Sequence, residues 1–162
     1  MDITYTDSIS ADEFNFIRAS VGFRQFHPEQ AEAEIHGSTR VIAAYHENAV
    51  VGMARLLWSG GVSASASVLV IPAFQNQGLE EEMMDRFFRF LKEQLKPGFG
   101  IQVDVRAFGR QQELYEKLGF QVSAVEQRGI PMHLCLTQNI ELTDNMFRQS
   151  ISLCFRHASD SP

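Results

Sequence analysis

Hydrophobic residues recur along this chain at two spacings, and each spacing predicts a different kind of element. Between positions 79 and 95 they return every three or four residues, which is the period of an amphipathic helix. Between 101 and 106 they alternate with polar residues, which predicts a half-buried strand. A helix followed by a strand in this way is the second half of a strand–helix–strand unit.

Local signals place the remaining elements. Ser10 and Glu13 have the spacing of a capping box, Pro28 suits a first helical turn, and Gly119 suits a helix end. Glu47-Asn48 joins two alternating runs as a hairpin. We therefore predict strands at 3–6, 39–45, 50–58, 63–71, 101–106 and 132–136, and helices beginning at 10, 28, 79, 112 and 141.

This order predicts a mixed α/β fold of the α+β type. A mainly antiparallel central sheet would be flanked by helices, with an additional C-terminal helix. We expect one domain over residues 1–140. Residues 141–162 would form a helix and tail that pack on the same domain or on a partner, because apolar positions occupy two stripes of that helix. A homodimer is the corresponding prediction.

Composition narrows the class of protein. The 162 residues are 44% hydrophobic and 21% charged, with a net charge of −6, which argues against a nucleic-acid partner. No signal peptide and no membrane-spanning run is recognisable, so we expect a cytoplasmic protein without a membrane partner. Cys135 and Cys154 fit buried free thiols, and the histidines show no metal-ligand spacing, so no metal is expected.

Two short stretches carry candidate chemistry. In the first, the strand ending at Val70 and Pro72 leads through Gln75 and Gly78 into a helix, and such a turn aims backbone N–H groups at one point where an anion can bind. A plain turn explains one glycine equally well. The second stretch, Leu114 to Phe120, would by itself be an ordinary helix end, with Leu114 and Leu118 facing the core and Tyr115 on a neighbouring face.

Together and in this order, the two stretches resemble the phosphate loop and tyrosine helix of the GNAT acyl-CoA N-acetyltransferase superfamily. The resemblance implies acetyl-CoA as co-substrate and no metal. It implies that main chain around Leu69 and Val70 binds the pantetheine arm as an added strand. It also implies Tyr115 as the acid that protonates the departing thiolate. The pyrophosphate would be held by the loop amides of Gln75, Asn76, Gln77, Gly78, Leu79 and Glu80.

Three positions depart from the family pattern. Glu80 stands where the family has Gly or Ala; it would weaken pyrophosphate binding by repulsion, although its side chain is expected to be able to turn into solvent. Ala107 replaces a frequent asparagine, and Ser67 stands where an acid often serves as base. Asp104 and His133 are substitutes by residue type only; each is as readily an ordinary strand residue, and a water chain is another route for the proton.

The leading interpretation is an N-acetyltransferase that moves an acetyl group from acetyl-CoA to a primary amine by direct attack. The acceptor would be a small molecule or a peptide. The alternatives are a catalytically silent GNAT-fold binding or oligomeric protein, and acyl transfer from a different donor. By analogy with the family, Phe23, Arg24 and Phe26 would shape the acceptor site. Ser63, Ser65 and Ser67 share one strand face, either a polar pocket or a solvated surface.

Overall fold

The computed structural model describes residues 2–108 and 111–122. The predicted strand 132–136, the predicted unit 141–162, His133, Cys135 and Cys154 lie outside the described residues. In chain order the elements are β1 (Thr4–Thr6), α1 (Ala11–Ser20), α2 (Pro28–His36), β2 (Arg40–His46), β3 (Ala49–Trp58), β4 (Ser63–Val70), the short 3₁₀ helix η1 (Pro72–Phe74), α3 (Leu79–Gln94), β5 (Gln102–Val105) and α4 (Gln111–Lys117).

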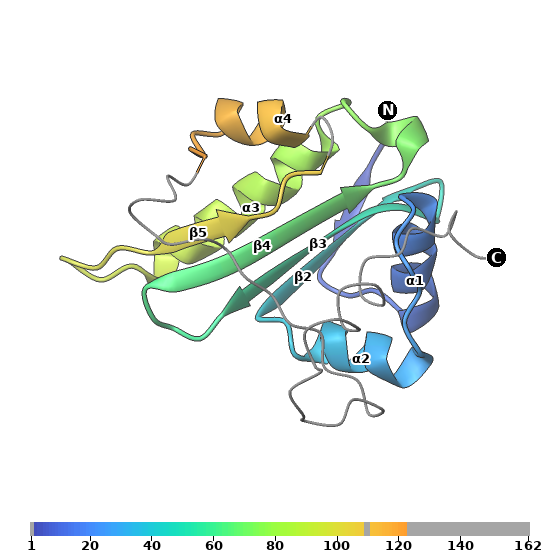
Figure 1. Cartoon of the computed structure of the whole chain (residues 1–162), viewed down its shortest axis with the longest axis horizontal. Helices are drawn as coiled ribbons and strands as arrows, with labels where there is room; N and C mark the ends of the chain where they lie inside the picture. The colour runs from blue at the N-terminus through green and yellow to red at the C-terminus, as the bar shows by residue number, and fades with distance from the viewer. Residues whose placement is uncertain (1, 109–110, 123–162) are drawn as a thin grey trace, which may run out of the picture.

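The five strands form one sheet in the order β1-β2-β3-β4-β5 (Figure 1). All neighbouring strands are antiparallel except β4 and β5, which α3 connects and which run parallel. The predicted mixed, mainly antiparallel sheet is therefore confirmed for the described part of the chain. The hairpin between β2 and β3 turns at Glu47 and Asn48, whose φ angles of 49° and 66° are typical of a tight two-residue turn.

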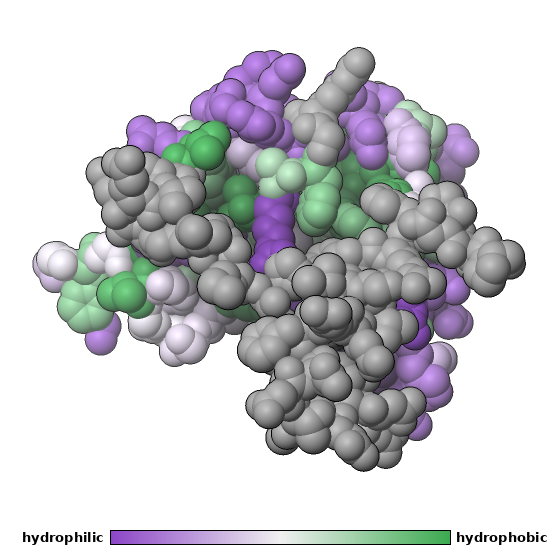
Figure 2. Space-filling model, viewed as in Figure 1, coloured by the Kyte–Doolittle hydropathy of each residue, from purple (hydrophilic) through white to green (hydrophobic). Residues whose placement is uncertain are grey.

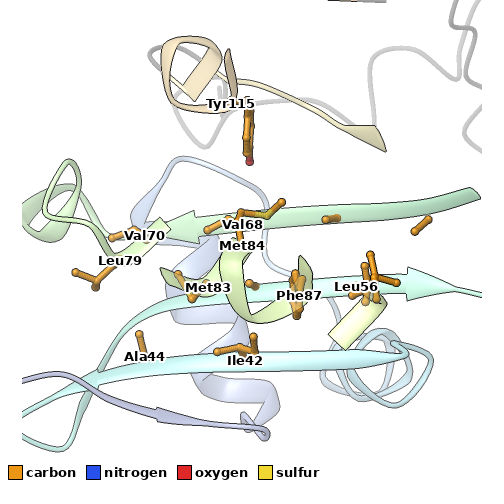
Figure 3. Packing of buried hydrophobic residues seen from close by; sticks show 14 of the residues in the cluster. Ile42, Ala44, Leu56, Val68, Val70, Leu79, Met83, Met84, Phe87 and Tyr115 are labelled. Atoms are coloured by element: carbon orange, nitrogen blue, oxygen red, sulfur yellow. The ribbon is translucent and has the colours of Figure 1, made fainter. Parts of the chain in front are cut away.

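Side-chain alternation divides the core into two layers. One face of the sheet carries Ile42, Leu56 and Val68, which pack against Met83 and Phe87 of α3 (Figure 3). The opposite face packs against α1 and α2, which lie across the sheet from α3 (Figure 1). The residues in that second layer are Ile9, Phe14, Ile17, Ala31, Val41, Ala43, Val50 and Met53. Both helix layers follow from the period-two pattern of buried strands.

The parallel pair of β4 and β5 extends along only part of β4. β5 pairs with β4 only from Ser63 to Ala66, so β4 continues to Val70 without a neighbour on that side. The Ile71 N–H donates to the Val51 carbonyl at 3.0 Å, which fixes the hydrogen-bonding phase between β3 and β4. Successive residues of β4 direct their N–H and C=O groups alternately toward β3 and away from it, so those of Val68 and Val70 point away from β3. These groups form an open edge of the sheet beside α4.

Ser63, Ser65 and Ser67 are exposed, whereas the alanines and Val68 between them are buried. Ser63 and Ser65 also line a cavity of about 560 Å³ together with Asp104, so the solvated face and the polar pocket that the sequence left open both describe part of this surface. The alternation leaves the apolar side of β4 for the core under α3.

Candidate functional site

The loop between β4 and α3 is shaped to present backbone N–H groups. Gly78 is the N-cap of α3 with φ 87°, and Asn76 also has a positive φ of 59°. Glycine takes this left-handed conformation without steric cost, and it provides no side chain to cap the helix. The first backbone bond of the helix runs from the Glu82 N–H to the Gly78 carbonyl, at 3.1 Å. The amides of the first helical turn therefore remain available to an anion.

The open edge of β4 is covered by two glutamine side chains. Nε2 of Gln75 donates to the Val70 carbonyl at 2.9 Å, and Nε2 of Gln111 donates to the Val68 carbonyl at 3.0 Å. Gln75 comes from the phosphate loop and Gln111 is the first residue of α4. The two bonds tie the loop and the tyrosine helix to the stretch of strand that the sequence assigned to pantetheine.

Tyr115 is the buried residue of α4, with 3% of its surface exposed. Its side chain points from α4 toward β4 near Val68 (Figure 3). Its ring meets Phe120 edge-on, with the ring centroids 5.4 Å apart. The sequence placed Leu114 and Leu118 toward the core and Tyr115 on a neighbouring face. Leu118 does pack against the core, but both leucines are only half-buried, and it is the tyrosine that enters the core, so the placement of Tyr115 was wrong. α4 packs by its tyrosine because the open edge of β4 leaves room for a large ring.

The Tyr115 hydroxyl is buried without a hydrogen-bond partner in the described structure. Burial, and secondarily the negative charge of Glu80, raise the pKa of Tyr115 to about 12. The hydroxyl is thus protonated at neutral pH and available as a donor. An unpartnered buried hydroxyl is uncommon in folded proteins and requires an explanation.

Glu80 is buried as well, with 6% of its surface exposed, so the expectation that its side chain turns into solvent is wrong. Burial raises the pKa of the Glu80 carboxyl, its own backbone N–H lowers that pKa by hydrogen bonding, and the charge of Glu81 raises it again. The Oε2 atom has no hydrogen-bond partner. Glu80 lines the same cavity as Gln75 of the loop and Gln111 of α4, and its charge acts on Tyr115.

A cavity of about 500 Å³ joins the loop, the open edge of β4, Glu80 and α4, and Tyr115 lies behind its wall without lining it. Its wall contains Val70 from the open edge, loop and helix residues including Gln75 and Glu80, and Gln111 and Leu114 of α4. The outward surface of α4 above it is hydrophilic (Figure 2). Among the described residues that line the cavity, the charged ones are Glu80, Glu81, Glu113 and Lys117, so acidic groups predominate.

The far wall of the cavity is aromatic. Phe23, from the segment after α1, meets Phe108 edge-on with the ring centroids 5.1 Å apart, and both line the cavity. The neighbouring Phe26 instead packs under the Arg18 guanidinium at 3.8 Å, and Arg24 is exposed. Of the three residues assigned to the acceptor site by analogy, the structure brings only Phe23 to the cavity.

The remaining candidates differ in their relation to the cavity. The backbone of Leu69 faces β3, so on the open edge the groups available to a ligand are those of Val68 and Val70; the Leu69 side chain lines the cavity from the other face. Asp104 is exposed on β5, where its carboxylate accepts from Gln102 Nε2 at 3.0 Å, and it does not line this cavity. Ser67 is exposed. Within residues 2–108 and 111–122 no group of His, Cys, Asp and Glu is arranged to hold a metal ion.

Sequence reasoning missed Gln111 and Phe108. Gln111 opens the tyrosine helix, and nothing in its local sequence distinguishes it from Gln112. Its role follows from the 43-residue separation between it and Val68, which only the fold closes. Phe108 carried one usable signal, since it is a large hydrophobic residue in a polar stretch after a strand.

Comparisons with known proteins agree with this geometry. The family model described as an acetyltransferase (GNAT) domain matches residues 6–134. A Bacillus subtilis protein, provisionally named as an acetyltransferase, is 31% identical over 106 residues, covering 64% of this chain and 69% of its own length. A second protein of the same organism, without an assigned function, is 28% identical over 101 residues, covering 61% of this chain and 65% of its own.

Solved structures share the fold at low sequence identity. A probable acetyltransferase from Staphylococcus aureus superposes with a TM-score of 0.71 at 18% identity, covering 82% of this chain and 99% of its own. A GNAT-family acetyltransferase from Streptococcus pneumoniae gives 0.63 at 20% identity, covering 85% and 98%. At these identities the likeness concerns the arrangement of elements.

Proposed function

Because the chain belongs to the GNAT acetyltransferase family, we propose that it transfers an acetyl group from acetyl-CoA to a primary amine. The amine attacks the thioester carbonyl directly, and Tyr115 donates a proton to the departing thiolate. The N–H of Val70, on the open edge of β4, is placed to donate to the carbonyl oxygen as charge develops on it. The amides of the loop and of the first turn of α3 hold the pyrophosphate.

The observation that carries this proposal is the Tyr115 hydroxyl. It is buried, protonated at neutral pH and without a partner, and it points at the stretch of β4 whose hydrogen-bonding groups face away from β3. A protein that used Tyr115 only for packing would be served equally by phenylalanine. An acid that meets a thiolate inside a closed site needs this arrangement.

The acceptor is proposed to be an amine with an apolar part. Phe23 and Phe108 form an aromatic wall on one side of the cavity, and Glu80, Glu81 and Glu113 make the remainder acidic. An aromatic wall and carboxylates both favour a cation, through ring faces and through charge.

The first test is a titration with acetyl-CoA by calorimetry, at low and at moderate salt. We expect a dissociation constant in the micromolar range, about −8 kcal/mol at 1 μM. Screening of small amines and peptides would follow, and with an acceptor in hand Tyr115→Phe should lower kcat by about 10²–10⁴-fold with an almost unchanged affinity for acetyl-CoA. Absence of binding up to about 1 mM would reject the proposal.

The second candidate is a GNAT-fold protein without catalysis, and the burial of Glu80 is the observation that favours it. A carboxylate about 6 Å from a phosphate costs about 2–3 kcal/mol at an effective dielectric near 20, and burial reduces the screening. Absence of acetyl-CoA binding, or binding without acetyl transfer to any acceptor, would favour this candidate, whereas full activity of Tyr115→Phe would only remove Tyr115 from the mechanism.

A further inference from the structure

Glu80 and Tyr115 form a pair of buried polar groups that the proposed reaction uses only in part. Each retains an oxygen without a hydrogen-bond partner, Oε2 of Glu80 and Oη of Tyr115. They are 6% and 3% exposed, and they are coupled, because the charge of Glu80 is one cause of the raised pKa of Tyr115. Each buried oxygen without a partner requires an explanation, and for Glu80, which lines the cavity, a bound ligand or a proton on the carboxyl would provide one.

If the Glu80 carboxyl is charged, its position opposes the binding of acetyl-CoA. Glu80 lies in the first turn of α3, one residue after Leu79, and its side chain lines the cavity beside Gln75 and Val70. Its own backbone N–H, one of those that would meet the pyrophosphate, acts on its carboxylate instead. A charged carboxylate at this point repels the pyrophosphate and competes with it for the Glu80 backbone N–H.

We propose that acetyl-CoA binds to the form of the protein in which the Glu80 carboxyl carries a proton, so that donor binding takes up a proton from solvent. This inference rests on the proposed function, since it concerns the same donor site. Protonation removes the repulsion without moving a side chain that is enclosed by α3 and α4. It also gives Glu80 an O–H with which to donate to a phosphate oxygen.

The surroundings of Glu80 make its protonation accessible. Glu81 and Glu82 share its helix, and α4 presents Tyr115, Glu113 and Lys117. On β1, Tyr5 is affected by the charge of Glu80. Arg86 is paired with Glu82 at 2.8 Å and lies over the Tyr5 ring.

Lys117 is thus the one cation among the described residues that line the cavity. Burial and the neighbouring Glu81 both favour the protonated carboxyl. A bound pyrophosphate adds charge of the same sign and favours it further.

The experiment is calorimetry with acetyl-CoA from about pH 5.5 to 8.5, in pairs of buffers that differ in ionisation enthalpy, which yields the number of protons taken up. The proteins are the wild type, Glu80→Gln and Glu81→Gln. Glu81 is exposed and lines the same cavity, so Glu81→Gln removes an equal charge without removing the buried carboxyl. The 3′-phosphate of acetyl-CoA, whose second pKa is about 6, can also exchange protons on binding. Glu80→Gln measures this contribution, which is then subtracted from the proton uptake of the wild type.

We expect the dissociation constant of the wild type for acetyl-CoA to rise about tenfold per pH unit above the Glu80 pKa. In that range the wild type should take up nearly one proton more on binding than Glu80→Gln does. Glu80→Gln should bind more tightly at neutral pH, with a nearly flat profile. Glu81→Gln should keep the proton uptake and the slope of the wild type, with the profile displaced to lower pH because the charge of Glu81 helps to raise the Glu80 pKa. Glu80→Ala, a residue type accepted in the family loop, should reproduce Glu80→Gln and guards against a folding defect.

Three results would overturn the inference. Equal proton uptake by the wild type and Glu80→Gln would mean that the carboxylate turns out to solvent or never meets the donor. Binding by Glu80→Gln but not by the wild type at the lowest pH would mean that a proton does not open the site. In both cases the acyl-CoA site itself would stand. Absence of binding by all variants at every pH would reject the inference together with the proposed function.

Discussion

Replacing Tyr115 by phenylalanine should make the free protein more stable while removing its general acid. The substitution deletes one buried hydroxyl that has no partner and leaves the ring in place against Phe120. A buried hydroxyl without a hydrogen bond costs about 1–3 kcal/mol in mutational series. Taking the lower end of that range, we expect the free energy of unfolding to rise by about 1 kcal/mol.

Tyr45→Phe is the matched control. The Tyr45 hydroxyl donates to Oε1 of Glu13 at 3.1 Å in a partly buried position, so its loss should lower stability by about 0.5–1.5 kcal/mol. The two tyrosine variants therefore have opposite expected signs. Urea unfolding at neutral pH measures both, and for a chain of this size 1 kcal/mol corresponds to about 2–4 °C in Tm.

A loss of stability in Tyr115→Phe equal to that in Tyr45→Phe would refute the reasoning. It would show that the Tyr115 hydroxyl is satisfied in the folded protein and that its geometry carries no functional meaning. The expected gain would instead mark a group that the fold keeps at a cost in stability, as is common for catalytic side chains.

Two further changes test the loop and the first helix cap. Gly78→Ala should lower the free energy of unfolding by about 1–2 kcal/mol. The cause would be backbone strain at φ 87° alone, because an added Cβ meets no atom within 4 Å. A free energy from urea unfolding that is unchanged within about 0.3 kcal/mol would contradict this. Burial alone would raise the pKa of Glu13, but hydrogen bonds from the Ser10 hydroxyl and amide and from Tyr45 lower it below its usual value of 4.5. The stability that the charged Glu13 contributes is therefore present above pH 4.5 and is lost as the pH falls through the lower folded-state pKa. Glu13→Gln should accordingly be less stable than the wild type at neutral pH and equally stable in acid. A loss of stability that does not depend on pH would contradict this role of the Glu13 charge.

The sequence predicted the elements that local chemistry decides. The capping box at Ser10 and Glu13 forms as expected, with the Glu13 N–H donating to the Ser10 hydroxyl at 3.3 Å. Gly119, which the sequence assigned to a helix end, has φ 91°, and Gly78, which it assigned to the turn before a helix, has φ 87°. Capping, turn chemistry and period act over a few residues, so they can be recognised before the fold is known.

The errors concern the direction of side chains that only tertiary packing decides. Tyr115 and Leu114 are adjacent on α4, and helical period alone does not say which of them faces the sheet until the open edge of β4 is known. For Glu80 the local signal was even misleading, because a carboxylate in the first turn of a helix is favourable when exposed. α4, more than thirty residues further along the chain, turns that exposed position into a buried one.

Glu80 also explains how a phosphate loop can be stable with an acid in it. The first turn of a helix attracts negative charge, and an acid there contributes about 0.3–1 kcal/mol when exposed. In this chain that acid is Glu80, whose side chain is buried and whose own backbone N–H lowers the pKa of its carboxyl. A charged carboxylate there would oppose binding of the donor pyrophosphate at the same helix turn. A proton on Glu80 removes that opposition, so the residue that most weakens the family pattern is also the one through which pH would control occupation of the site.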